Sequence, residues 1–154
     1  MKAHLAIGPR NASPRKRRSV VAEIDAAVTD THALLYHAGG RGLGPRAAAV
    51  FQAAEARRAV IYVPMPVLWE VTLLARARKI NLRRTPRVFF VDLFTNVAYQ
   101  PYDLTREQVF EADELRFNRD PFDALIVAAA RALALPLLTR DADIRASGAV
   151  RIIW

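Results

Sequence analysis

Apolar and polar positions follow two patterns along the chain. Short apolar runs of strand length alternate with longer segments in which apolar residues recur at the i, i+3, i+4 spacing of a helix face. The strand-length runs lie at 26–30, 60–63, 135–139 and 150–154, with a weaker candidate at 101–104. The helical segments are one that begins at 31 and those at 46–58, 66–79, 86–96, 105–116 and 121–133. Because no hairpin signal joins consecutive strands, the pattern predicts an α/β fold, a parallel sheet with helices on both faces.

The stretch 118–143 contains the densest set of chemically active side chains. Asp120 precedes Pro121, and proline is favoured at the first position of a helix because its missing N–H would be unpaired there. We therefore expect Asp120 to cap a helix whose first turn contains Asp123. The rest of this helix is almost entirely apolar, which predicts that it is buried on nearly all sides.

Carboxylates also follow the strands. Asp141 and Asp143 come directly after the run at 135–139, and Asp30 ends the first run. Glu70 lies in the helix after the second run, and the residues that share its helix face are apolar. In a parallel sheet, the carboxyl ends of strands and the first turns of the helices that follow them lie at one edge. We therefore expect these carboxylates to meet there.

The predicted cluster has the chemistry of a metal site. Neighbouring carboxylates cannot all stay ionised without a cation, and oxygen ligands favour hard divalent ions, Mg²⁺ or Mn²⁺. The chain has no cysteine and no glycine-rich phosphate loop, and its three histidines, His4, His32 and His37, lack the spacing of a metal site or a catalytic triad. Such a site can polarise a phosphoryl oxygen and activate water.

Two members of the cluster also allow purely structural interpretations. Asp30 could be only the N-cap of the helix that begins at Thr31, although Thr31 would serve that purpose as well. Glu70 could form a buried ion pair with an arginine, which would have to come from a distant part of the chain.

Composition indicates one globular domain. The chain has 154 residues, of which 53% are hydrophobic and 25% charged, and it contains no apolar run of membrane-spanning length. The absence of cysteine excludes a disulfide scaffold and thiolate chemistry and fits a cytoplasmic protein. The net charge of +8 favours polyanionic partners. A bias towards arginine that follows from the base composition of the genome explains the arginine content equally well.

The first 20 residues are predicted to be a basic, disordered arm, and 21–154 to be the folded domain. The arm contains the run Arg15, Lys16, Arg17 and Arg18 and shows no periodicity. Acidic residues interrupt the apolar stretch behind it, so it does not resemble a signal peptide. These four side chains are candidate RNA-phosphate contacts. The preferred interpretation is that the segment is a solubilising tail, or that the start codon was assigned too far upstream.

Four motifs together resemble the PIN domain, and most closely the VapC-type toxins of type II toxin–antitoxin pairs. They are AspThrHisAlaLeuLeu (30–35), TrpGlu (69–70), ArgAspProPheAsp (119–123) and ThrArgAsp (139–141), in the order that the family has them. The resemblance implies a three-layer fold with a central parallel sheet of four to five strands. It implies a Mg²⁺- or Mn²⁺-dependent ribonuclease with an acidic metal site of Asp30, Glu70, Asp123 and Asp141, and with Asp120 and Asp143 as supporting or capping residues.

The expected function is that of an endoribonuclease toxin which hydrolyses RNA phosphodiester bonds. The expected partners are an RNA substrate, a small antitoxin that covers the acidic cleft and a second copy of the chain. Two alternatives are a non-catalytic RNA-binding PIN domain and a structure-specific DNA nuclease. The sequence departs from the family at Tyr36, where tryptophan is frequent, at Met65, where a small polar residue is usual, and at Ala124, where arginine is common.

Overall fold

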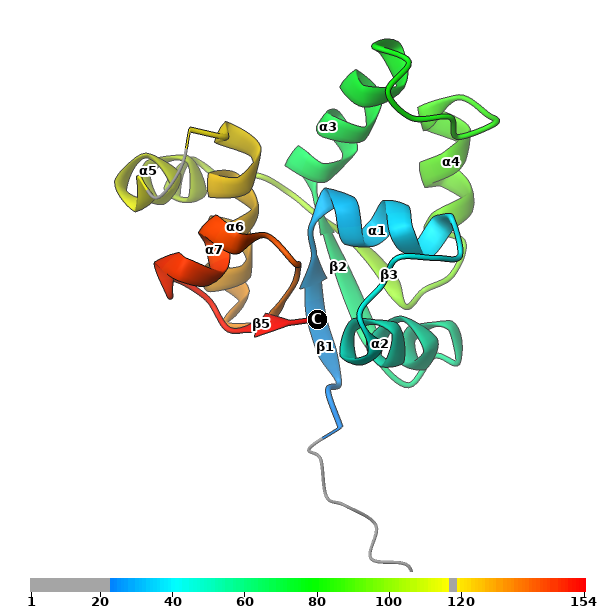
Figure 1. Cartoon of the computed structure of the whole chain (residues 1–154), viewed down its shortest axis with the longest axis horizontal. Helices are drawn as coiled ribbons and strands as arrows, with labels where there is room; N and C mark the ends of the chain where they lie inside the picture. The colour runs from blue at the N-terminus through cyan, green and yellow to red at the C-terminus, as the bar shows by residue number, and fades with distance from the viewer. Residues whose placement is uncertain (1–22, 117–118) are drawn as a thin grey trace, which may run out of the picture.

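A computed structural model describes residues 23–116 and 119–154 (Figure 1). The basic run Arg15 to Arg18 and the proposed boundary at residue 20 lie outside this described part. None of the helices in the described ranges is long and apolar enough to cross a membrane.

The core of the protein is a five-stranded sheet whose paired strands are all parallel. Its strands are β1 (Ala26–Thr29), β2 (Val60–Pro64), β3 (Tyr99–Tyr102), β4 (Leu137–Leu138) and β5 (Ile152–Ile153). The strand order is β3-β2-β1-β4-β5, so the chain moves outward from β1 to β3 and then returns to build the other half. The direction of winding reverses between β1 and β4, and crevices at the carboxyl ends of strands form at such a switch point.

Seven helices of the described residues connect and cover the strands. They are α1 (Thr31–Ala38), α2 (Pro45–Glu55), α3 (Met65–Arg76), α4 (Pro86–Leu93), α5 (Arg106–Leu115), α6 (Pro121–Leu133) and α7 (Ala142–Ser147). In Figure 1, α1 to α4 lie on one side of β1, and α5 to α7 lie on the other. Right-handed crossovers require this arrangement when the winding direction reverses. The predicted parallel α/β sheet with helices on both faces is confirmed.

Several boundaries differ from the sequence pattern. The weak strand predicted at 101–104 begins two residues earlier, because the buried Tyr99 pairs with β2 in register with Ile61. Pro101 is tolerated there because β3 is an edge strand. The helices α2 and α3 end three residues before the predicted ends, each just before an arginine with positive φ, Arg57 or Arg78. A left-handed residue ends the regular hydrogen-bond ladder of a helix.

The helix α6 supplies the part of the core that supports the site. Its central residues, Ile126 to Ala130, are all fully buried, as the apolar pattern predicts. Arg131 forms an ion pair with Glu111 of α5 and donates to the carbonyl oxygen of Ala149. Because the centre of α6 is buried, its N-terminal end holds the carboxylates of Asp120 and Asp123 in a fixed position.

Candidate active site

Asp30 lies at the carboxyl end of β1 and is almost completely buried, with 5% of its surface exposed. Its Oδ1 atom accepts a hydrogen bond from the backbone N–H of Ala33 at 2.6 Å, so Asp30 caps α1. Thr31 does not act as the cap, because its hydroxyl donates to Glu70 instead. Asp30 is therefore the N-cap of α1, as the structural interpretation of this residue predicted. Capping alone does not explain why a carboxylate stands at this buried position, where asparagine or serine would cap as well.

Asp141 lies three residues beyond the end of β4. Its Oδ1 accepts from the backbone N–H of Ile144 at 2.8 Å, so it caps α7. Thr139 connects the two aspartates: its hydroxyl oxygen accepts from the backbone N–H of Asp141 at 3.1 Å, and its side chain also hydrogen-bonds to Asp30. The buried threonine thus fixes the two strand ends relative to each other.

The first turn of α6 brings further carboxylates to the same edge. Asp120 caps α6 through a 2.8 Å hydrogen bond from the N–H of Phe122, as predicted, and Asp123 lies in the first turn. A cleft of about 360 Å³ opens here, which we call the acidic cleft. It is lined by Asp30, His32, Tyr36, Asp120, Asp123, Arg140, Asp141 and Ala142.

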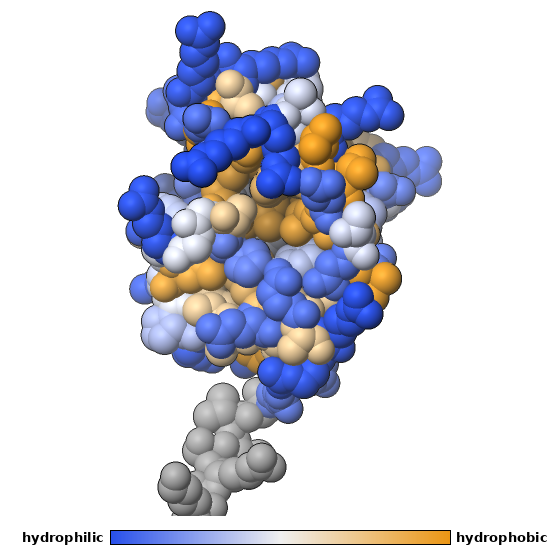
Figure 2. Space-filling model, turned by 90° about the vertical axis from the view of Figure 1, so that its right-hand side faces the viewer, coloured by the Kyte–Doolittle hydropathy of each residue, from blue (hydrophilic) through white to orange (hydrophobic). Residues whose placement is uncertain are grey.

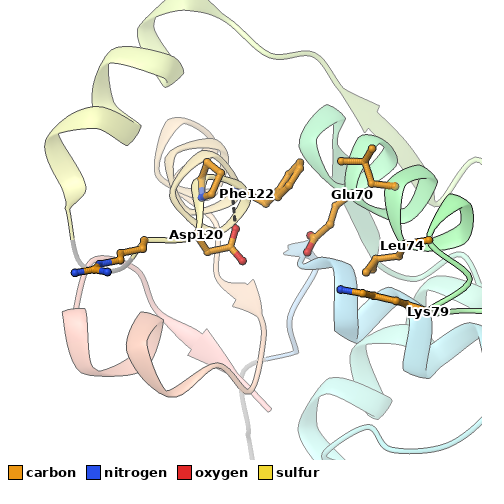
Figure 3. A pocket seen from close by; sticks show the side chains of 9 residues that line it. Glu70, Leu74, Lys79, Asp120 and Phe122 are labelled. Carbon is orange, nitrogen blue, oxygen red and sulfur yellow. Dashed lines mark hydrogen bonds between the residues drawn. The ribbon is translucent and has the colours of Figure 1, made fainter.

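Glu70 lies beside the acidic cleft rather than among its lining residues. It lines an adjoining cleft of about 580 Å³ between α3 and the start of α6, and Asp120 lines both clefts. In Figure 3 the carboxylates of Glu70 and Asp120 face each other across the adjoining cleft, and the amino end of Lys79 points into it. Among the described residues Glu70 forms no ion pair with lysine or arginine, and the hydroxyl of Thr31 donates a hydrogen bond to it.

The carboxylates influence one another electrostatically. Burial raises the pKa of Asp30 above its ordinary value, and the charge of Asp141 raises it further against the hydrogen bonds of Thr139 and Ala33. Burial also raises the pKa of Glu70, with smaller contributions from the charges of Asp120 and Asp30. Mutual repulsion together with burial is the electrostatic pattern of a functional carboxylate cluster.

The donor set fits a hard divalent cation by its chemistry. Four aspartates converge on the acidic cleft, and a cation there would offset both their burial and their repulsion. As their side chains stand, no group of three or more histidine or acidic residues in the described part of the chain is close enough together to hold an ion. The structure therefore provides the ligand types in one cleft, and side-chain rotation would have to complete a coordination sphere.

The structure separates the predicted residues into three groups. Asp30, Asp123 and Asp141 share the acidic cleft together with Asp120, whereas Glu70 lies at its border through Asp120. Asp143 lies on the exposed side of α7 and lines neither cleft. The assignment of metal-binding roles to these side chains stays a prediction.

Three further lining residues, His32, Tyr36 and Arg140, were not predicted. Arg140 stands between Thr139 and Asp141, so the strand-end argument that selected Asp141 applies to it equally. His32 and Tyr36 follow Asp30 along α1 at helical spacing, but their orientation towards the cleft depends on how α1 packs.

Comparison with known proteins places this geometry in context. Residues 27–149 match the family model described as the PIN domain. A search of curated proteins found no match. Among solved structures, the chain is similar to VapBC2 from Rickettsia felis bound to a promoter DNA fragment, with 15% identity, a TM-score of 0.61, and 83% of this chain and 97% of that chain covered.

Two other solved structures show the same likeness. One is a toxin–antitoxin complex from Klebsiella pneumoniae, with 21% identity, a TM-score of 0.56, and 83% and 96% of the two chains covered. The other is VapC20 from Mycobacterium tuberculosis, described as a toxin that cleaves the sarcin–ricin loop, with 19% identity, a TM-score of 0.59, and 81% and 98% covered.

Proposed function

Because the chain belongs to the PIN domain family, we propose that it is a divalent-metal-dependent endoribonuclease and the toxin of a toxin–antitoxin pair. The observation that carries the proposal is the convergence of Asp30, Asp120, Asp123 and Asp141 on one cleft at the switch point of the sheet. Carboxylates collected at this edge lower stability unless they bind a cation, so their collection is best explained by a function.

The chain's own residues would divide the work. Asp30, Asp123 and Asp141 hold Mg²⁺ or Mn²⁺, with Glu70 completing the set from the adjoining cleft. When bound, the ion supplies Lewis-acid polarisation of the phosphodiester and a lower pKa for water. The hydroxyl of Thr31 donates to Glu70 and orients its carboxylate, which could accept a proton from the attacking water. Thr139 hydrogen-bonds to the side chain of Asp30 and to the backbone of Asp141, and Asp120 caps the helix that contains Asp123.

RNA is the substrate that we propose, with DNA and non-catalytic binding as the alternatives. VapC20, one of the structural relatives, carries the description of a toxin that cleaves the sarcin–ricin loop. The high net charge of +8 is consistent with a polyanionic substrate. Four aspartates share one cleft, which supports a nuclease over a domain that only binds.

A protein partner is also part of the proposal. Two relatives were solved in complexes described as VapBC or toxin–antitoxin. The present structure has an apolar groove of about 760 Å³ between α3 and α4, which includes Leu68, Phe90 and Phe94 and is bordered by arginines. Figure 2 shows apolar side chains gathered in a hollow among hydrophilic ones on this side of the molecule. Such a surface suits an antitoxin segment with apolar and acidic residues.

We propose in addition that the protein forms a homodimer. Phe110 and Val109 of α5 are exposed, with 63% and 45% of their surfaces accessible. Adjacent exposed apolar side chains of this kind favour an interface. Light scattering of the wild type and of Phe110→Glu would show a dimer that the variant dissociates; a monomeric wild type would contradict this part of the proposal.

The nuclease proposal is tested with purified protein and matched RNA and DNA oligonucleotides of one sequence. We expect internal cleavage of RNA in Mg²⁺ or Mn²⁺, none in EDTA and little cleavage of DNA. Preferential cleavage of DNA would support the DNA nuclease, and RNA binding without cleavage in either metal would support the non-catalytic alternative. Asp141→Asn serves as the protein control, because asparagine keeps the cap of α7 and removes the charge.

A further inference from the structure

Arg140 introduces a positive charge into the acidic cleft. Among the residues that line this cleft in the described part of the chain, it is the one arginine or lysine beside four aspartates. It leaves the end of β4 between Thr139 and Asp141, so it is anchored to the same strand end as the proposed metal ligands.

The guanidinium of Arg140 is held by the aromatic side chain of Tyr36. Its Nη2 donates a hydrogen bond to the hydroxyl of Tyr36, and its Cζ lies 4.8 Å from the centroid of the Tyr36 ring. Two contacts with one tyrosine hold the guanidinium at the wall of the acidic cleft.

Tyr36 is itself held from two sides. The ring of Trp154 meets it edge-on, with centroids 6.1 Å apart. Gly42 packs against it so closely that a Cβ atom there would come within 2.9 Å of Cδ1 of Tyr36, and Gly42 has a φ of +92°. A side chain at position 42 would therefore displace the ring, and the loop between α1 and α2 keeps Tyr36 under Arg140.

We propose that Arg140 binds a non-bridging oxygen of the RNA phosphodiester that enters the acidic cleft, and that Tyr36 positions its guanidinium for this contact. The proposal rests on the ribonuclease function above. Four carboxylates would repel a phosphate, and the positive charge of Arg140, oriented by the Tyr36 ring in the same cleft, offsets part of that repulsion. The planar guanidinium can donate two parallel hydrogen bonds to a phosphate, which an ammonium group cannot reproduce.

The test measures binding of the full chain to a short single-stranded RNA in EDTA, by fluorescence anisotropy over a range of salt. We expect Arg140→Gln to weaken binding about tenfold and to reduce the log–log salt slope by about 0.7, the contribution of one phosphate contact on a single strand. The matched control is Arg145→Gln on α7, which changes the net charge equally at an exposed position outside both clefts. Equal losses in both variants would mean that only net charge matters and would overturn the proposal.

Two conservative variants separate binding from packing. Arg140→Lys should restore the salt slope but not the rate of cleavage, because it keeps the charge and loses the paired donors. Tyr36→Phe keeps the ring and should raise KM for RNA with little change in melting temperature. Sp and Rp phosphorothioate substrates add a readout that a structural role would not move: the wild type should discriminate between them, and Arg140→Gln should discriminate less.

The outcomes distinguish this proposal from the proposed function. If the wild type binds RNA with a slope that depends on Arg140 but does not cleave it in Mg²⁺ or Mn²⁺, the ribonuclease function fails and the phosphate contact stands. If the wild type cleaves RNA while Arg140→Gln and Arg140→Lys match the Arg145→Gln control, the phosphate contact is refuted. A wild type that neither binds RNA in EDTA nor cleaves it in Mg²⁺ or Mn²⁺ refutes both.

Discussion

Two regions of this protein shift the pKa values of their carboxylates in opposite directions. At the carboxyl edge of the sheet, burial and neighbouring charges raise the pKa values of Asp30 and Glu70. Beside α1 and α2, the His37 cluster, made of His37, Glu55 and Tyr99, lowers the pKa of its carboxylate, chiefly through the hydrogen bond from Tyr99.

The difference lies in the partners. Glu55 accepts from the hydroxyl of Tyr99 at 2.5 Å, and Nε2 of His37 lies 2.9 Å from it. His37 also stacks on Phe51 with ring centroids 4.3 Å apart, so the cluster is part of the packing between helices. The acidic cleft places carboxylates opposite carboxylates. A carboxylate with donors around it stabilises the fold, whereas carboxylates collected against each other require an external cation.

The largest expected difference between the two regions is in catalysis. Asp30→Asn and Asp141→Asn should each reduce metal-dependent RNA cleavage about a hundredfold or more, because each removes a charge that we propose holds the cation. Glu55→Gln should leave the cleavage rate within about twofold. Initial rates with the same RNA measure all three, and circular dichroism checks the folds. Near-normal cleavage by either aspartate variant would contradict the site assignment.

The next difference concerns metal binding. At a Mn²⁺ concentration about a hundredfold above Kd, the ion should stabilise the wild type by about 2.7 kcal/mol. Glu55→Gln should show the same rise in melting temperature, and Asp30→Asn a much smaller one. Thermal melts with and without Mn²⁺ provide the measurement. An equal rise in all three proteins would place the bound ion outside the acidic cleft.

The pH dependence of stability should have opposite signs in the two regions. The pKa of Asp30 in the folded state lies above its ordinary value of 3.8. At a pH between the unfolded and the folded pKa, the folded state therefore binds more protons than the unfolded state. Its contribution therefore lowers the free energy of unfolding as pH rises from about 4, by up to about 1.4 kcal/mol per pH unit for one group. Glu55 has a lowered pKa, so its contribution is present above its ordinary 4.5 and is lost on acidification.

Metal-free melts between pH 4 and 7 test this sign. The melting temperature of Asp30→Asn relative to wild type should increase with pH, because asparagine still caps α1 and carries no buried charge. That of Glu55→Gln relative to wild type should decrease over the same range. If the melting temperatures of the wild type and of Asp30→Asn change with pH in parallel, ionisation of Asp30 does not destabilise the fold.

The sequence pattern predicts most of the fold and the general position of the site. The alternation of apolar runs and helical segments is enough for the parallel sheet, because helical segments separate the apolar runs and no hairpin signal joins them. Asp30 and Asp141 could be placed at one edge because they directly follow strands. The offset of β3 could not be predicted, since it depends on the register of Tyr99 against Ile61.

Contacts between distant segments also escape the sequence pattern. Tyr36 and Arg140 are 104 residues apart, and their contact requires the packing of α1 beside the end of β4. Likewise, nothing local indicates that Glu70 accepts from Thr31, or that it lines a cleft next to that of the aspartates. Periodicity orders elements along the chain, whereas the composition of a cleft depends on side-chain directions from several elements at once.

The smallest expected effect comes from the hydroxyl of Tyr99. Tyr99→Phe keeps the buried ring and removes the donor that contributes most to the lowered pKa of Glu55. A hydrogen bond to a buried charge would contribute more, but 52% of the Glu55 side chain is exposed and water replaces part of the loss. We therefore expect a decrease of about 0.5–1 kcal/mol in the free energy of unfolding at pH 7.

Because Glu55 contributes only when ionised, the difference in unfolding free energy between Tyr99→Phe and wild type should shrink as pH falls below 4.5. Urea unfolding at pH 7 and pH 4 measures it, with Tyr62→Phe as the control for loss of a tyrosine hydroxyl elsewhere in the sheet. A loss of stability that stays constant with pH would show that Tyr99 acts through packing. It would also show that hydrogen-bond donors in the His37 cluster do not stabilise the ionised form of Glu55.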